Sequence, residues 1–144
     1  MKTCLRHLLV LAVAAFAPMA QADFYLIVPA ANPQPALTQH EAVGLFMGRN
    51  RAFHSGEVAQ VYDLPRDSTQ RAEFYQRLTG MGPAQINSYW ARLMFSGQTM
   101  PPYAVPDEAA MVAVVKSNAN AIGWVRKDPN DKALRVLLVL KDPT

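Results

Sequence analysis

Short apolar segments that end at prolines or polar turns predict the strands of this chain. Residues 23–28 are almost wholly apolar and stop at Pro29, which is typical of a buried strand. A second apolar segment closes at Pro65. Two more lie near the C-terminus, so the predicted strands are 23–28, 58–64, 121–125 and 134–140.

Apolar residues at helical spacing predict four helices between these strands. Thr38-Gln39-His40-Glu41 has the form of a capping box, and Gly48 stops the helix that follows. Asp67 or Ser68 can cap a second helix, which stops at Gly80. The third starts at Pro83, and Pro106-Asp107-Glu108 begins the fourth.

The expected order is β-α-β-α-α-α-β-β, with irregular, proline-containing segments at 29–35 and 95–103. Apolar strands that alternate with amphipathic helices favour an α/β layered domain whose sheet is covered by helices. The chain shows no internal repeat and no linker.

Residues 1–22 have the pattern of a secretory signal peptide. Lys2 and Arg6 precede an apolar run at 8–17, and Ala20-Gln21-Ala22 has the small-x-small form of a cleavage site. The run has about ten residues, whereas a membrane-spanning helix needs roughly 20. We therefore expect an exported, periplasmic protein that begins near Asp23, and a buried N-terminal helix is the alternative.

Removal of this leader changes the composition. Cys4, the only cysteine, lies in the leader, so residues 23–144 exclude disulfides, thiolate chemistry and cysteine-ligated metals. Lys2 and Arg6 also leave, and 12 of the 14 basic residues then stand against 11 acidic ones. A net charge of +1 gives no reason to expect nucleic acid as a partner. Residues 23–144 have the length of one domain.

The segment from Asp63 to Arg71 is the best candidate for a binding site. It runs from a predicted strand through a short loop into a helix, and free backbone N–H groups at a helix N-terminus attract anions. Ser68, Thr69 and Arg71 add hydroxyl and guanidinium donors. The alternative is ordinary capping by Asp67 or Ser68 with a solvated Arg71.

Catalytic and metal-binding chemistry has little support. His40 and His54 are the only histidines beyond the leader, and neither lies in a metal-binding pattern. No serine lies in a Gly-x-Ser-x-Gly elbow. We expect no catalytic residue, metal or cofactor.

Four motifs in order resemble the phosphate-type substrate-binding proteins of bacterial ABC transporters. In that family an apolar-Phe-x-Gly-basic helix end, a serine-containing anion loop and a Gly-x-Ile-Gly-aromatic-Val strand follow one another. The matching segments here are Leu45-Phe46-Met47-Gly48-Arg49, Val61-Tyr62-Asp63-Leu64-Pro65 with Ser68 and Phe74, Tyr89-Trp90 with Phe95-Ser96-Gly97, and Asn120-Ala121-Ile122-Gly123-Trp124-Val125.

The resemblance implies one lobe of a type II periplasmic binding protein, with a mixed sheet between helices. It places the anion loop on Asp67, Ser68, Thr69 and Gln70, with Arg71 as a further donor. This sequence departs from the family in having no glycine between Asp63 and Gly80, which makes close backbone approach to an anion harder. Residues 23–144 also have room for one lobe only.

Two functions follow as hypotheses. The first is a periplasmic binding module for phosphate or a similar oxyanion, linked to ABC-type transport or sensing and without enzymatic activity. The second is an interaction module of an inner-membrane transporter or sensor, which an exposed apolar patch near Pro101, Pro102 and Tyr103 would favour. A homodimer would rebuild a two-sided cleft. A hydrolase would require His40 or His54 to meet a loop serine.

Overall fold

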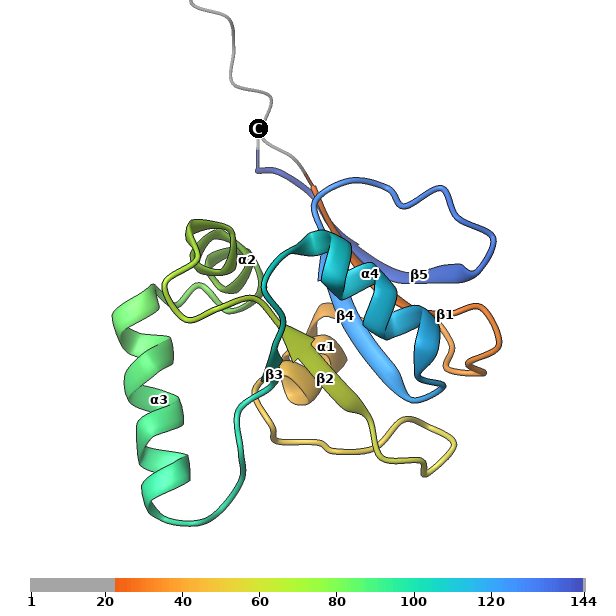
Figure 1. Cartoon of the computed structure of the whole chain (residues 1–144). Helices are drawn as coiled ribbons and strands as arrows, with labels where there is room; N and C mark the ends of the chain where they lie inside the picture. Colours follow the sequence, from red (N-terminus) through yellow and green to blue (C-terminus); the bar gives the residue numbers. More distant parts are fainter. Residues whose placement is uncertain (1–22, 144) are drawn as a thin grey trace, which may run out of the picture.

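Five strands form one sheet in the computed structural model, which describes residues 23–143 (Figure 1). The predicted signal peptide lies outside the described residues. Along the sheet the strands stand in the order β3-β2-β4-β1-β5. The elements are β1 (Phe24–Pro29), α1 (Gln39–Phe46), β2 (Gln60–Asp63), α2 (Thr69–Thr79), α3 (Pro83–Phe95), β3 (Tyr103–Ala104), α4 (Glu108–Ser117), β4 (Ala121–Val125) and β5 (Leu134–Leu140).

The sheet is mixed, as the resemblance implied. β1 pairs antiparallel with β4 on one side and with β5 on the other, so that Leu26 lies opposite both Trp124 and Leu138. β2 pairs parallel with β4 and with β3. The carboxyl ends of β2 and β3 therefore lie together, and Asp63 is the last residue of β2.

Two adjacent residues of β4 show how helices cover both faces of the sheet. Gly123 faces α4, where it lies against Met111. Trp124 points to the opposite face and stacks on Phe74 of α2, with ring centroids 4.6 Å apart. Phe74 also contacts Phe46 of α1, so α1 and α2 share that second face. This arrangement confirms the predicted layered α/β fold.

The predicted helix ends agree with the structure at most positions. Thr38 and Glu41 form the capping box of α1, and the chain leaves that helix through Gly48 at a φ of 68°. Ser68 is the N-cap of α2, which ends at Gly80 with a φ of 76°. α3 begins at Pro83, as expected.

Three local predictions need correction. The segment 95–103 was expected to be irregular, but its last residue begins the two-residue strand β3. The second strand is shorter than 58–64, because Val58 forms only an isolated bridge with Ala52. α4 begins at Glu108 with Asp107 as its N-cap, so Pro106 lies outside the helix. Asp107 accepts a hydrogen bond from the amide of Ala110, as an N-cap residue does.

Among residues 23–143, no helix has the length and apolar character needed to cross a membrane.

Candidate functional site

A buried ion pair joins the end of β2 to the start of α2. Arg71 Nε donates to Asp63 Oδ2 at 2.8 Å, and both side chains are more than nine-tenths buried. The helical period explains why Arg71 points inward, because Arg71, Phe74, Tyr75 and Leu78 are the buried residues of α2.

Asp63 accepts further hydrogen bonds from α2, from β4 and from the residue that follows it. Tyr75 Oη donates to Oδ2 at 2.9 Å, while Leu64 N at 2.8 Å and Trp124 Nε1 at 3.3 Å donate to Oδ1. Burial raises the pKa of the Asp63 carboxyl, because the charged form loses its hydration, and the Arg71 guanidinium acts in the opposite direction. Through its hydrogen bonds, the Asp63 carboxylate thus links β2 to β4 and to α2.

The N-terminus of α2 is capped by the chain itself. Ser68 Oγ accepts a hydrogen bond from the amide of Arg71 at 3.2 Å. Thr69 and Gln70 occupy the first two helical positions, whose amides have no partner within a helix. Those two amides and the helix dipole remain available to an anion beside Arg66, whose side chain is exposed.

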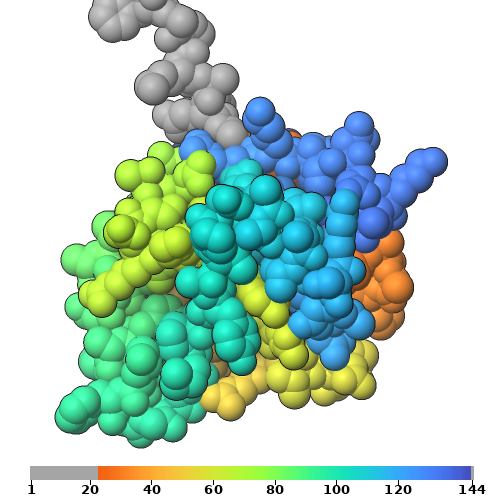
Figure 2. Space-filling view, viewed as in Figure 1, coloured from red at the N-terminus to blue at the C-terminus, as the bar shows by residue number. Residues whose placement is uncertain are grey.

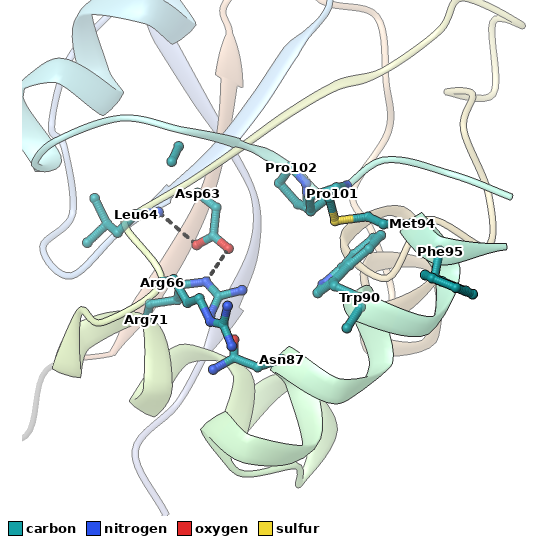
Figure 3. A pocket seen from close by; sticks show the side chains of 12 residues that line it. Asp63, Leu64, Arg66, Arg71, Asn87, Trp90, Met94, Phe95, Pro101 and Pro102 are labelled. Carbon is teal, nitrogen blue, oxygen red and sulfur yellow. Dashed lines mark hydrogen bonds and ion pairs between the residues drawn. The ribbon is translucent and has the colours of Figure 1, made fainter. Parts of the chain in front are cut away.

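A pocket of about 600 Å³ opens beside this helix start (Figure 3). Its polar end is formed by residues of β2, of the loop to α2, of α2 and of α3, namely Asp63, Arg66, Arg71 and Asn87. Arg71 Nη1 reaches Asn87 Oδ1 at 3.4 Å. The polar end therefore combines one neutralised ion pair with one further arginine.

The remaining walls of the pocket are apolar. One wall is a stripe of α3, and the other consists of the carboxyl end of β2 with the segment that leads through β3. The first wall holds Trp90, Ala91, Met94 and Phe95, and the second holds Leu64, Pro101, Pro102 and Ala104. In Figure 3, Trp90, Met94, Phe95 and Pro101 lie away from the two arginines, whereas Leu64 lies on the same side as they do. In Figure 2, α3 lies at the lower left of the molecule, next to the segment that precedes α4.

The structure separates the five residues that the sequence placed in an anion site. Arg71 lines the pocket, but its Nε is committed to Asp63. Ser68 caps α2, and Asp67, Thr69 and Gln70 lie at the helix start without lining the pocket. Their role in ligand binding stays a prediction.

The histidines lie apart from this pocket. His54 Nε2 contacts Glu41 Oε1 at 3.2 Å, and His40 is exposed. Within residues 23–143, no group of histidine and carboxylate side chains is placed to hold a metal ion.

Sequence reasoning missed part of the pocket. Trp90 was assigned to the core, and with 5% of its surface exposed it does belong there, but one edge of it also lines the pocket. Asn87 and Met94 were not singled out for binding. A signal was present, because Asn87, Trp90, Ala91 and Met94 recur at the spacing of one helix face.

Comparison with solved structures gives the same fold. The chain superposes on an assigned phosphate ABC transporter substrate-binding protein with bound phosphate from Clostridium perfringens, with a TM-score of 0.64 and 17% identity. It also superposes on an ABC-type phosphate transport receptor from Vibrio cholerae, with a TM-score of 0.62 and 18% identity. No family model and no curated protein matches the sequence. The predicted resemblance is confirmed at the level of the fold.

These likenesses extend over most of this chain and part of the others. They cover 81% of this chain, but 45% of the Clostridium protein and 47% of the Vibrio protein. The chain thus spans less than half of the length of the structures that it matches.

Proposed function

We propose that this protein is a solute-binding module for phosphate or a similar oxyanion, without catalytic activity, that works outside the cytoplasm with an ABC-type transporter or a sensor. The observation that carries the proposal is the start of α2 beside Arg66, on a fold shared with a structure that contains bound phosphate. Free amides, a helix dipole and an exposed guanidinium are suited to a small anion.

Several features of the described residues support an anion at this place. The amides of Thr69 and Gln70 belong to the first turn of an 11-residue helix. The side chain of Arg66 has no hydrogen bond or ion pair within residues 23–143, so binding an anion would break no existing contact. Asp63 does not repel the ligand strongly, because Arg71 neutralises it at 2.8 Å.

Calorimetric titration of the purified protein with phosphate and with sulfate tests this proposal. Replacement of Arg66 by glutamine should weaken binding by about tenfold or more, because a charge-assisted hydrogen bond is lost. Arg92→Gln is the matched control, since Arg92 is an exposed arginine of α3 that does not line the pocket. Millimolar phosphate should also raise the melting temperature. Neither heat nor stabilisation with either anion would refute the proposal.

An exposed apolar surface favours a second candidate, an interaction module. The end of α3 and the segment after it expose Met94, Phe95, Met100 and Tyr103, with 98% of Phe95 accessible to solvent. Such clusters often mark protein interfaces. Light scattering across a concentration series would detect a homodimer, and Met100→Glu should abolish it while leaving anion binding unchanged, because Met100 is exposed and does not line the pocket. A constant monomer mass would remove self-association from consideration.

A further inference from the structure

The pocket is larger and more apolar than an inorganic oxyanion requires. Its volume of about 600 Å³ falls within the range of small-molecule sites, and eight of its twelve lining residues are apolar. A phosphate ion at Arg66 would contact the polar end only. The surfaces of Trp90, Met94, Pro101 and Pro102, which lie near one another in Figure 3, would stay in contact with water.

The charges at the polar end select the sign of a ligand. Asp63 and Arg71 neutralise each other, and Asn87 is neutral. Arg66 contributes one positive charge for which the described residues supply no partner. A ligand with one anionic group would complete the pairing at this end, whereas a cation would meet an unpaired arginine.

Trp90 supplies an independent sign of an unmet polar contact. Its indole is 95% buried and lines the pocket, and its Nε1–H has no hydrogen-bond partner among the described residues. Buried donors in native proteins are nearly always satisfied, so an unpaired one at the wall of a pocket indicates an acceptor that is supplied from elsewhere. An oxygen atom carried by a ligand within the pocket would meet this need.

We propose that the pocket binds an organic oxyanion, such as a phosphonate or phosphate monoester with a compact aryl or alkyl group. This inference rests on the proposed oxyanion-binding function and names the ligand class of the same site. The anionic head lies at Arg66, which lines the polar end of the pocket. The apolar group lies between the α3 wall and Pro101-Pro102, where its burial displaces water from both surfaces.

The relative affinities of four ligands test this proposal. Burial of an aromatic ring between apolar walls should make phenylphosphonate bind at least about tenfold more tightly than inorganic phosphate. Methylphosphonate should fall between the two ligands. Benzyl alcohol, which has the ring without the charge, should bind more weakly than phenylphosphonate by about tenfold or more, because Arg66 stays unpaired.

Replacing each of two alanines of α3 by phenylalanine tests the apolar part of the pocket apart from the anion site. Ala91 is exposed and lines the pocket, so Ala91→Phe should fill the apolar part and remove the advantage of phenylphosphonate over phosphate. Ala84→Phe is the matched control, because Ala84 is exposed on the same helix but lies outside the pocket lining. Melting curves of both variants show whether they fold.

Each outcome of calorimetry with these ligands has a defined reading. Tighter binding of phenylphosphonate that Ala91→Phe abolishes and Ala84→Phe preserves supports the inference. Equal affinities for phosphate and phenylphosphonate overturn the inference and leave the proposed function standing. Equal binding of benzyl alcohol and phenylphosphonate also overturns it, because the anion is then unnecessary. Failure of every oxyanion to bind overturns the proposed function as well. If Ala91→Phe changes only a concentration-dependent mass, the apolar wall belongs to a protein interface and the inference is wrong.

Discussion

Replacing Asp63 and replacing Arg71 should lower the stability of the protein by different amounts, although the two residues form one ion pair. In Asp63→Asn the Arg71 guanidinium stays buried and charged, because arginine does not lose its proton in proteins. In Arg71→Met the positive charge is removed, and the Asp63 carboxyl can take up a proton and become neutral. We therefore expect Asp63→Asn to be the more destabilising of the two.

The burial and the distance of the ion pair give the expected loss in the free energy of unfolding. Asp63→Asn disrupts an ion pair of 2.8 Å with more than nine-tenths of each side chain buried, and such losses cost about 3–5 kcal/mol. For a domain of this size that corresponds to a fall in melting temperature of roughly 10–20 °C. Arg71→Met keeps the volume of the buried stem and the hydrogen bond from Tyr75 Oη, so we expect a loss of about 1–3 kcal/mol.

The pH dependence of Arg71→Met provides a second test. Without Arg71, the pKa of the buried Asp63 lies still further above its ordinary value. A carboxyl whose pKa is raised by folding contributes stability at low pH, which is lost as the pH rises through the native pKa. Relative to the parent protein, Arg71→Met should therefore be more stable at about pH 5 than at pH 7.

Urea denaturation followed by circular dichroism, at both pH values, measures these effects. The double variant Asp63→Asn/Arg71→Met should lose less than the sum of the two single losses, because it leaves no unpaired charge. Equal losses in the two single variants at neutral pH, together with a pH-independent Arg71→Met, would refute this reasoning and return Arg71 to the role of an uncommitted ligand donor.

Three further predictions concern local contacts. Hydrogen bonds from Thr38 lower the pKa of Glu41, so the stability lost in Glu41→Ala should be greatest above the ordinary pKa of glutamate and disappear as the pH falls through the lowered pKa. Thermal melts across pH would show a constant difference if the idea is wrong. Gly123→Ala places a Cβ against the side chain of Met111 and should cost about 1–3 kcal/mol, whereas Gly44→Ala in α1 meets Asn50 Cβ at an ordinary 3.6 Å and should be neutral or stabilising by up to about 1 kcal/mol; similar urea midpoints for the two would contradict this. Ser68→Ala removes the N-cap of α2 and should cost about 1 kcal/mol in the same assay, so an unchanged midpoint would show that the cap is dispensable.

The sequence predicted the elements well where local rules decide them. Capping residues and glycine stops determined both ends of α1 and α2, since those interactions span only a few residues. β3 was missed because two residues carry no periodicity. Tyr103 and Ala104 are placed by pairing with Tyr62 and Asp63, some 40 positions earlier, and local sequence does not encode such a contact.

The candidate site was predictable in position but not in internal arrangement. A strand, a loop and a capped helix start were recognisable from 63–71. The alternative of a solvated Arg71 is wrong, because its spacing from Phe74, Tyr75 and Leu78 places it on the buried face of α2. Its role as a donor to an anion stays a prediction. The apolar pocket depends on Pro101 and Pro102 lying near α3. This is a tertiary contact, and local sequence patterns do not predict it.

The position of β1 has a consequence for the order of folding. β1 lies between β4 and β5, which follow it in the sequence at Ala121–Val125 and Leu134–Leu140, and the amide of Asp142 donates to Asp23 Oδ1 at 2.8 Å. The sheet cannot close until nearly the whole chain is available, and such long-range pairing makes folding slow. A product that stops before Leu134 therefore leaves one edge of β1 unpaired and exposed to aggregation.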